Sequence, residues 1–549
     1  MSLQSKQSGD RQANQQVNQQ ASLWAEKFVH GADAASLFAP EALWRDYLAM
    51  AWDLQTHEGL DAISNALPSP IGERVEIVSA PSDDEIIFSF NGPNGRIKAL
   101  ATIQDGLCIR LFTSLEEMSD DYHQNDETPQ VLIIGAGQSG LALAAQLQEL
   151  HVPYLVAEQN ARIGDNWRNR YNSLVLHDPV WVNHLPFKAF PDNWPTFTPK
   201  DMMGDWLEAY AQELQLTIKC NSTIKAASFD EATKKWHVIM IENGHETSFT
   251  IAHIVFAVGT SGFAHTPEFA GAEDFSGTQM HSSAYRSGAE FAGKSVTIIG
   301  ATNSAHDIAV DLVKHGAKPT LIQRSSTHVV PHKVYLDDIL APLYAPTHNR
   351  ALAEADFLSV ATPMRHLEQK GQAIFDTAQT EWKEFYTALE ETGFNLDFAE
   401  DGSGIIGKYR RSASGYYIDV GGSQYVIDAK IAVKTGAGVK ALTKTGVTLT
   451  DKTDLTSDAI IYATGFGSME QWVARLIGQE TAEKIGRCWG YGSGYRGDPG
   501  PWEGELRNMW KPTAQQGLWF MGGNLAQVRI YSHYLAMQLC HHANQERQL

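Results

Sequence analysis

The chain has the sequence VLIIGAGQSG at residues 131–140, and this stretch decides the fold class. An apolar run, Val131–Ile134, leads into a complete G-x-G-x-x-G cluster, and helical periodicity follows over Leu141–Leu150. A second strand is expected at Tyr154–Ala157. A strand, a glycine turn, a helix and a second strand in this order are typical of a βαβ unit in a parallel sheet.

The spacing within this first glycine turn predicts a dinucleotide site. Gly135 permits the tight turn out of the strand, Gly137 lets the backbone approach a pyrophosphate, and Gly140 lets the helix pack on the sheet. The amino end of the helix offers N–H groups and partial positive charge to the phosphates. Glu158 ends the next strand, where an acid binds ribose hydroxyls. The residues expected at this site are Gly135, Gly137, Gln138, Ser139, Gly140 and Glu158.

The same pattern recurs later in the chain. Ser295–Ile299 predicts a strand, Ser304–His315 a helix and Thr320–Gln323 a further strand, and residues 300–305 between them are GATNSA. Two nucleotide-binding halves in one polypeptide are therefore expected. The predicted fold is α/β, with two Rossmann-like domains built on parallel sheets.

The second glycine turn departs from the fingerprint at Thr302, which replaces the middle glycine and is expected to crowd a pyrophosphate. We therefore expect this loop to run differently or to bind more loosely. No acid follows the next strand, and Arg324 stands there instead. A guanidinium can hold a 2′-phosphate by paired hydrogen bonds, which selects NADPH over NADH, although a solvated surface arginine is the alternative. The residues expected at this site are Gly300, Thr302, Asn303, Ser304, Arg324 and Ser325.

Composition excludes several functional classes. The 549 residues carry a formal net charge of -21, which disfavours nucleic acid and anionic membranes as partners. No run of about 18 apolar residues predicts a membrane span. The four cysteines are far apart without a C-x-x-C pair, which argues against disulfides, a zinc site and a redox dithiol. No metal site is expected among the 20 histidines, and a reducing, cytoplasmic location fits.

The amino-terminal part of the chain has a different pattern. Helical periodicity over Ser22–Leu37 and Trp44–Leu54 precedes four strand-like segments, which are Arg74–Ser79, Glu85–Asn91, Arg96–Ile103 and Leu107–Thr113. This order favours an α+β cone over residues 21–117. Residues 1–20, rich in Gln and Ser, predict a disordered tail, and the polar residues 118–128 predict a linker.

One segment between the two glycine turns resembles a family signature. Residues 275–286 are FSGTQMHSSAYR, which match F-x-G-x-x-x-H-x-x-x-Y-[KR] of the flavin-containing monooxygenases at every fixed position; Baeyer–Villiger relatives usually have tryptophan in place of Tyr285. Residues 164–167, GDNW, resemble the G-G-x-W segment after the FAD acid, with Asp165 in place of a glycine. Further segments resemble the plant YUCCA branch and its microbial relatives, among them LHDP at 176–179, IDVG at 418–421 and ATGF at 463–466. The resemblance covers roughly residues 129–549, whereas 21–117 resembles the cone of the nuclear transport factor family.

The resemblance implies FAD at the first glycine turn and NADPH at the second. In this family NADPH reduces FAD, the reduced flavin forms a C4a-hydroperoxide with O2, and one oxygen atom passes to nitrogen or sulfur of a small molecule. In the YUCCA branch the substrate is an α-keto acid, which is oxidatively decarboxylated. A Baeyer–Villiger ketone oxygenase, an NADPH oxidase or reductase, and a non-catalytic flavoprotein remain open as alternatives.

Two residues are candidates for a catalytic role by motif position. His177 matches a residue near the flavin in the family, with a satisfied core histidine as the alternative. Asn303 is expected to face the nicotinamide, with a helix N-cap as the alternative. The resemblance places further residues at the FAD, and these are Asn166, Trp167, Gly465, Gly523 and Gln527.

These observations predict the domain organisation. We expect an FAD-binding domain over 129–285 and 440–549, and an NADPH-binding domain over 286–439 with a helical substrate cap at about 330–415. The expected partners are a small-molecule substrate and O2, and a homodimer is left open.

Overall fold

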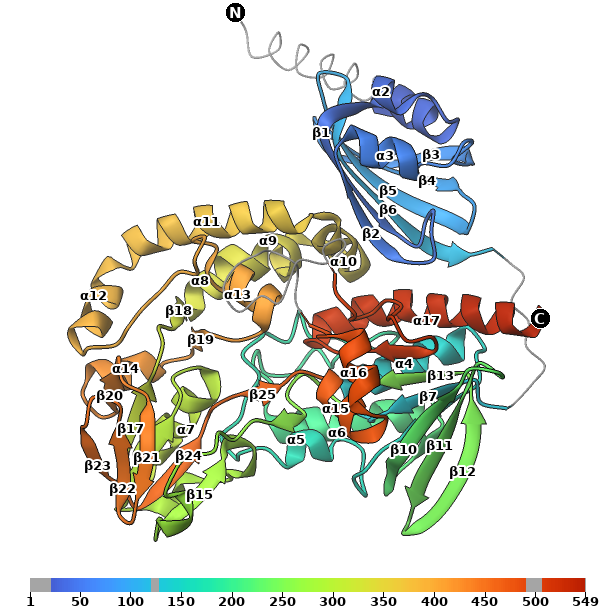
Figure 1. Ribbon diagram of the computed structural model, residues 1–549. Coiled ribbons are helices and arrows are strands. Elements are labelled where there is room, and N and C mark those ends of the chain that lie inside the picture. Colours follow the sequence, from blue (N-terminus) through green and yellow to red (C-terminus); the bar gives the residue numbers. More distant parts are fainter. Residues whose placement is uncertain (1–20, 120–127, 490–505, 549) are drawn as a thin grey trace, which may run out of the picture.

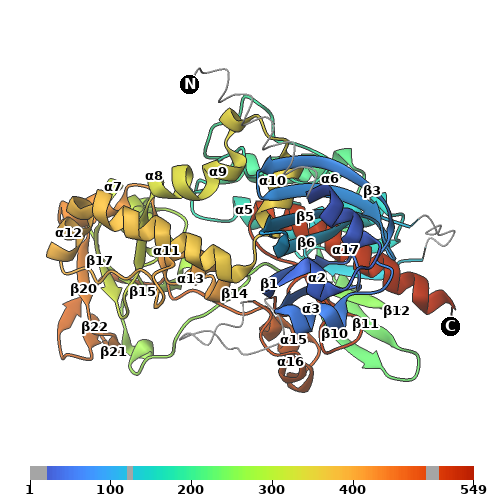
Figure 2. The ribbon, with the colours of Figure 1, turned by 90° about the horizontal axis from the view of Figure 1, so that it is seen from above.

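The computed structural model describes residues 21–119, 128–489 and 506–548 (Figure 1). The predicted tail, 1–20, and most of the predicted linker, 118–128, lie outside the described residues. The predicted α/β class with two parallel sheets is confirmed. The amino-terminal unit stands above the long carboxyl-terminal helix α17 (Leu525–Gln548), as Figures 1 and 2 show.

The amino-terminal unit is one six-stranded sheet with short helices. Its strand order is β2-β1-β6-β5-β4-β3, and the helix over 21–29, α2 (Ala34–Leu37) and α3 (Leu60–Ala66) accompany it. The strands are β1 (Phe38–Tyr47), β2 (Leu54–Glu58), β3 (Glu73–Ser82), β4 (Glu85–Asn91), β5 (Gly95–Gln104) and β6 (Leu107–Met118). The four strands predicted in this unit are confirmed.

The helix predicted at Trp44–Leu54 is wrong, because β1 extends to Tyr47 and β2 begins at Leu54. The last six residues of β1 are all buried, since one face of the strand packs on the core of its own unit and the other faces helices of the remaining chain. A strand buried on both faces loses the polar–apolar alternation that identifies strands.

The first parallel sheet has the order β26-β13-β7-β8-β9, and every pairing in it is parallel. Its strands are β7 (Val131–Ile134), β8 (Tyr154–Ala157), β9 (Ile218–Lys219), β13 (His253–Phe256) and β26 (Leu518–Phe520). Helix α4 (Gln138–Glu149) packs against α17. Around this core lie α5 (Asp165–Arg168), α6 (Lys200–Glu213), α15 (Glu470–Leu476), α16 (Gln479–Ile485) and an antiparallel sheet of β10 (Ser222–Asp230), β11 (Lys235–Glu242) and β12 (His245–Ile251).

The second parallel sheet has the order β15-β24-β16-β17-β20. Its strands are β15 (Thr278–His281), β16 (Ser295–Ile299), β17 (Lys318–Gln323), β20 (Ala432–Thr435) and β24 (Ala459–Tyr462), with α7 (Asn303–Lys314), α14 (Gly422–Ile427) and the small sheet β21 (Val439–Thr443), β22 (Gly446–Leu449) and β23 (Asp454–Thr456) beside them. Strands β15 and β24 of this sheet lie within the ranges that the sequence assigned to the FAD-binding domain. One precedes and the other follows the predicted NADPH-binding range, and both pair in parallel with the rest of the sheet.

The two parallel-sheet units are joined by two passages of the chain, and these pair as the short antiparallel ribbon β14 (Phe263–Ala264) and β25 (Phe466–Gly467). A helical cap is inserted between the parallel pair β18 (His328–Pro331) and β19 (Tyr416–Asp419). It contains α8 (His332–Val334), a π-helical turn at Tyr335–Leu340, α9 (Ala341–Tyr344), α10 (Leu352–Ala361), α11 (Met364–Glu381), α12 (Lys383–Glu391) and α13 (Gly404–Ser412).

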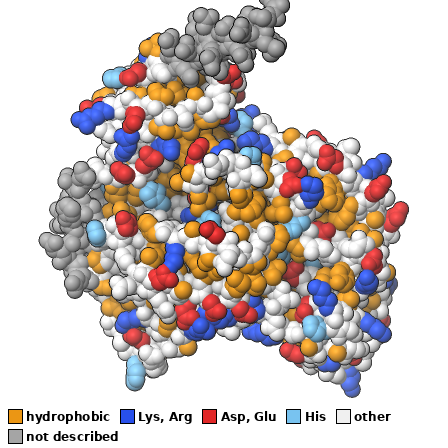
Figure 3. Space-filling model, turned by 180° about the vertical axis from the view of Figure 1, so that it is seen from behind, with side chains coloured by type: hydrophobic (Ala, Val, Ile, Leu, Met, Phe, Trp, Pro, Cys, Tyr) orange, Lys and Arg blue, Asp and Glu red, His pale blue; other side chains and the backbone are white. Residues whose placement is uncertain are grey.

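The apolar core continues between units. One cluster of buried side chains runs from Phe28 and Phe88 in the amino-terminal unit to Ile133 in β7 and Leu535 in α17. The second parallel sheet and the cap have clusters of their own. Figure 3 shows hydrophobic side chains in the central part of the rear face, with charged side chains around its rim. Within the described residues, no helix is both long and apolar enough to cross a bilayer.

Candidate active site between the two glycine turns

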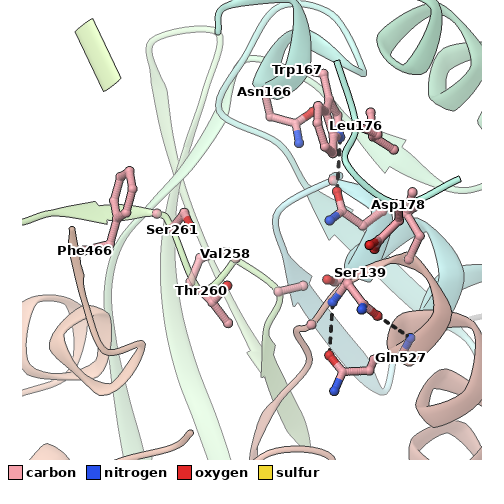
Figure 4. A pocket seen from close by; sticks show the side chains of 18 of the residues that line it. Ser139, Asn166, Trp167, Leu176, Asp178, Val258, Thr260, Ser261, Phe466 and Gln527 are labelled. Atoms are coloured by element: carbon pink, nitrogen blue, oxygen red, sulfur yellow. Dashed lines mark hydrogen bonds between the residues drawn. The ribbon is translucent and has the colours of Figure 1, made fainter. Parts of the chain in front are cut away.

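A continuous cavity of about 980 Å³ connects the first glycine turn with the start of α7. Its volume lies at the upper end of the range of about 300 to 1,000 Å³ that is usual for small-molecule sites. Residues of both parallel-sheet units, the cap and the amino-terminal unit line it. Figure 4 shows part of this wall, which includes Ser139 in the first turn of α4, Trp167 and Gln527.

The first glycine turn has the geometry that a pyrophosphate requires. Gly135 has a φ of +106°, in the region that favours glycine, and a Cβ on Gly140 would overlap the carbonyl oxygen of Gly135. Gly137 faces the cavity, and a Cβ there would come 3.2 Å from the side-chain nitrogen of Asn166. The turn thus leaves free space in front of the amino end of α4, and this cradle fits the phosphates of FAD.

Glu158 is buried, with 6% of its surface exposed, and it braces the turn. One carboxylate oxygen accepts the N–H of Ala136 at 2.7 Å. The other accepts the backbone and side-chain N–H groups of Asn160 at 2.8 and 2.7 Å. A carboxylate has about four lone-pair sites, so these bonds leave acceptor capacity for a ribose hydroxyl. Glu158 also lines the cavity, as the prediction for it requires.

Gly140 packs inside the turn and does not line the cavity, but the remaining residues predicted at the FAD line it, with one exception. Trp167 donates its ring N–H to the side-chain oxygen of Gln138 at 3.2 Å, as drawn in Figure 4. Gln527 accepts the hydroxyl hydrogen of Tyr409 at 2.5 Å and thereby connects α17 to the cap. The predicted residues that line the cavity here are Gln138, Ser139, Asn166, Trp167, Gly523 and Gln527.

The exception is Gly465, which precedes β25 and has a φ of +83°. Its carbonyl oxygen lies 3.0 Å from the ring nitrogen Nε2 of His281. Tyr285 is fully buried and donates its hydroxyl to Asp311 at 2.6 Å. The signature residues therefore fasten β15 and the turn after it to the segment before β25 and to α7.

The second glycine turn follows the same path as the first. Each helix begins three residues after the first glycine, α4 at Gln138 and α7 at Asn303. Thr302 has a φ of -110°, an extended conformation open to any residue, and the matching Gly137 has a φ of -77°. The expectation that this loop runs differently is therefore wrong, because the middle position does not need a positive φ; looser binding stays a prediction.

Asn303 lines the cavity and does not cap α7. Thr302 is the N-cap residue, and the side-chain oxygen of Asn303 accepts the N–H of Ile418 in β19 at 2.9 Å. The alternative of an Asn303 N-cap is therefore wrong. Ser304 lines the cavity beside it.

Arg324 and Ser325 lie after β17, outside the large cavity. They line a separate hollow of about 480 Å³ together with Glu390 and Asn395. Arg324 is exposed, and its alkyl chain runs close to Gly438, where an added Cβ would come 3.4 Å from its Cδ. A 2′-phosphate at the carboxyl edge of β17 would meet this guanidinium.

His177 forms an ion pair in the cavity wall. Its Nε2 lies 3.4 Å from a carboxylate oxygen of Asp307 in α7, and 15% and 13% of the two side chains are exposed. Tyr171 donates its hydroxyl to the same oxygen of Asp307 at 2.6 Å. Burial lowers the pKa of His177, but contact with Asp307 and the charge of Asp178 outweigh burial, so the pKa lies above its usual value. Burial raises the pKa of Asp307, but His177 and Tyr171 outweigh it, so that pKa is lowered.

A second buried acid stands beside the first pair and was missed by sequence reasoning. Asp178 accepts the hydroxyl hydrogen of Tyr335 in the cap at 2.6 Å. Burial raises the pKa of Asp178, although this hydrogen bond opposes the shift. Its position next to His177 in the LHDP segment was the only available signal.

We name the part of the cavity that is lined by the cap and by β19 the cap compartment. Its walls carry phenol rings and branched apolar side chains, which include Tyr335, Ile339, Tyr344, Ile405, Tyr409 and Tyr416. Arg410 of α13 and Arg45 of β1 also line the cavity. No motif pointed to Arg45, because it lies outside the part of the chain that resembles the family.

Comparisons with known proteins agree with this geometry. A family model described as pyridine nucleotide-disulphide oxidoreductase matches residues 132–405. Indole-3-pyruvate monooxygenase YUCCA1 of Oryza sativa subsp. japonica is 33% identical over 341 residues, which cover 62% of this chain and 77% of that protein. Probable indole-3-pyruvate monooxygenase YUCCA3 of Arabidopsis thaliana is 37% identical over 210 residues, which cover 37% of this chain and 48% of that protein.

Solved structures share the fold. The flavin-containing monooxygenase from Stenotrophomonas maltophilia has a TM-score of 0.51 at 19% identity, over 75% of this chain and 98% of that chain. The open form of cyclohexanone monooxygenase has a TM-score of 0.54 at 16% identity, over 76% and 88%.

The two parallel-sheet units, each with a glycine turn after its central strand and with a cavity between them, define a flavoprotein oxidoreductase with two dinucleotide sites. The four cysteines are far apart in the sequence and form no C-x-x-C pair, so the sequence lacks the C-x-x-C motif of a redox dithiol. The chain belongs to the flavin-containing monooxygenase family, in the branch of the YUCCA enzymes. It is an FAD- and NADPH-dependent monooxygenase.

Proposed function

We propose that the chain oxidatively decarboxylates an aromatic α-keto acid. The observation that carries this proposal is that one cavity is lined by residues of both cofactor turns, by the phenol rings and apolar side chains of the cap compartment, and by Arg410. Aromatic and apolar walls suit an aryl group, and a guanidinium suits a carboxylate. The plant relatives are named for indole-3-pyruvate, a substrate of this chemical class.

The proposed reaction balances as follows. The keto acid, O2, NADPH and H⁺ give the shortened carboxylic acid, CO2, water and NADP⁺. The bond between the keto carbon and the carboxyl carbon breaks, and one oxygen atom enters the product acid. When bound, FAD and NADPH supply the two electrons and the activation of O2.

The chain's own residues would hold and orient these groups. Gly137 and the amino end of α4 would hold the pyrophosphate of FAD, and Asn303 and Ser304 would meet NADPH at the start of α7. The contact with Asp307 raises the pKa of His177, which favours the protonated imidazole in the cavity wall. A protonated imidazole held there would favour negative charge that develops nearby.

The assay uses purified protein with FAD and follows NADPH, O2, CO2 and organic products. Indole-3-pyruvate is compared with a tertiary amine and a thioether of similar size. We expect indole-3-acetate and CO2 to form in equal amounts, one for each NADPH consumed, and NADH to be a poorer reductant. If an N-oxide or a sulfoxide were the main product, the substrate would be an amine or a thioether and not a keto acid. Release of hydrogen peroxide with every substrate would identify an oxidase.

An Arg410→Met variant tests the carboxylate contact. Its KM for indole-3-pyruvate should rise about tenfold, the value of one charge-assisted hydrogen bond, while KM for NADPH stays constant. An unchanged KM would remove Arg410 from the proposal.

We also propose a cytoplasmic location, which is supported by four cysteines that are all free.

A further inference from the structure

Strand β1 of the amino-terminal unit has two faces with different tasks. Trp44 donates its ring N–H to the hydroxyl of Thr113 at 2.8 Å, and that hydroxyl donates to Asp46 at 2.5 Å, inside the unit. Because side chains alternate along a strand, Arg45 and Tyr47 project from the opposite face. That face lies against the rest of the chain.

The neighbouring strand β6 extends this face. In the parallel register of β1 and β6, Phe112 stands opposite Arg45 and Ser114 opposite Tyr47. Together these four residues form what we name the docking face. Its β6 half contacts two helices: the rings of Phe112 and Phe357 in α10 are 5.1 Å apart, and the hydroxyls of Ser114 and Tyr534 in α17 are 2.8 Å apart.

Arg45 caps the carboxyl end of α10. One of its terminal nitrogens donates to the carbonyl oxygens of Val360 at 2.6 Å and Thr362 at 2.9 Å. Val360 belongs to the last turn of α10 and Thr362 is its C-cap residue, and a cation is favourable at this end of a helix. Only 3% of Arg45 is exposed, and both Arg45 and Val360 line the cavity. The guanidinium therefore fixes a part of the cavity wall that belongs to the cap.

Tyr47 makes the matching contact with α17. Its hydroxyl lies 3.4 Å from that of Tyr531, which also lines the cavity. On its other side, the ring of Tyr531 stacks on Trp510 with centroids 3.9 Å apart. Tyr531 is thus held between a residue of the amino-terminal unit and one of the catalytic part.

We propose that the amino-terminal unit is a fixed wall of the substrate cavity, and that Arg45 and Tyr47 are positioning residues that set the shape of the cap compartment through α10 and Tyr531. The continuous apolar core between this unit and the first parallel sheet supports a fixed placement. The proposal rests on the proposed function only for the choice of probe substrate.

The test compares variants of the full chain with FAD bound. Arg45→Ala removes the cap of α10, and Tyr47→Phe removes one hydroxyl. Arg96→Ala is the matched control, because Arg96 lies on the same sheet and pairs with Glu76 at the surface. We expect Arg45→Ala to raise KM for indole-3-pyruvate about tenfold and Tyr47→Phe to raise it less, with KM for NADPH and FAD content unchanged in both.

A second readout does not need turnover. Hydrogen–deuterium exchange over residues 352–364 should be faster in Arg45→Ala than in wild type and unchanged in Arg96→Ala. If Arg45→Ala does not fold, Arg45→Lys and Tyr47→Phe decide by the same two measurements. The proposal would be overturned if the Arg45 and Arg96 variants had the same KM for indole-3-pyruvate and the same exchange rate. It would also be overturned if Arg45→Ala raised KM for indole-3-pyruvate and KM for NADPH by the same factor. If wild type does not oxidise indole-3-pyruvate, the proposed substrate fails, and exchange alone decides the inference.

Discussion

Replacing Asp307 by asparagine isolates the charge that holds His177 in the cavity wall. The substitution keeps the size of the side chain and an oxygen that can accept the hydroxyl of Tyr171. It removes the negative charge 3.4 Å from the imidazole. Burial would then act on His177 with less opposition, and we expect its pKa to fall below its usual value.

The size of the effect follows from the geometry. Two unit charges 3.4 Å apart attract by about 5 kcal/mol at an effective dielectric constant of about 20. Desolvation offsets part of this attraction, and breaking a buried pair by removing one partner costs about 3 to 5 kcal/mol. Because His177 can become neutral, we expect a loss near the lower value, about 3 kcal/mol.

The pH dependence has a definite sign. The contribution of His177 is complete below its unfolded-state pKa of about 6.5 and is lost as pH rises through its raised folded-state pKa. The contribution of Asp307 is complete above about 3.9 and is lost as pH falls through its lowered folded-state pKa. The pair therefore stabilises the fold most between about pH 4 and pH 6.5.

Thermal unfolding of wild type and Asp307→Asn at about pH 6 and about pH 9 tests this reasoning, with the imidazole resonances of His177 recorded by NMR. The melting temperature of the variant should fall more at the lower pH, where the wild-type imidazole is charged. A loss of equal size at both values, or an unchanged titration of His177, would refute the ion pair.

Three further substitutions have expected outcomes. Gly140→Ala should lower both the melting temperature and the flavin absorbance per chain, because a Cβ would overlap a backbone carbonyl. Gly137→Ala should keep the melting temperature and lower only the affinity for FAD, so equal melting temperatures of the two variants would contradict this reasoning. Arg324→Ala should raise KM for NADPH about tenfold or more and leave KM for NADH unchanged, as steady-state kinetics would show. Arg529→Met should cost about 3 kcal/mol in thermal unfolding, because the partly buried carboxylate of Asp356 loses its cationic partner and keeps only the hydroxyl of Tyr344; a smaller loss would mean that water reaches the carboxylate.

The nucleotide-binding part of the fold was predictable because its geometry is written in adjacent residues. The strands at Tyr154–Ala157 and Ser295–Ile299 have the expected bounds. Helix α4 begins at Gln138, three residues before the predicted Leu141, because the glycine turn itself supplies the first helical turn. Apolar periodicity cannot detect polar residues and glycine at a helix start.

The pairs that shape the cavity were not predictable for a physical reason. His177 meets Asp307 and Asp178 meets Tyr335 across 130 or more positions of the chain, so no local pattern records the contact. The glycines of the first turn were predictable because backbone conformation and close packing restrict the residue type at Gly135 and Gly140. Arg45 lies in a strand without alternation, and only the packed structure shows what it touches.

The ribbon β14–β25 has a mechanical consequence. Within the part of the chain that the structure describes, the two parallel-sheet units are connected only through the segments that this ribbon pairs, and this is where a hinge between them would lie. The amino-terminal unit, however, forms hydrogen bonds both with α10 of the cap, on one side of the ribbon, and with α17, on the other side. A large rotation of the two nucleotide-binding halves would break these contacts. We therefore expect substrate entry and product release to depend on local movements of the cavity walls and not on that rotation.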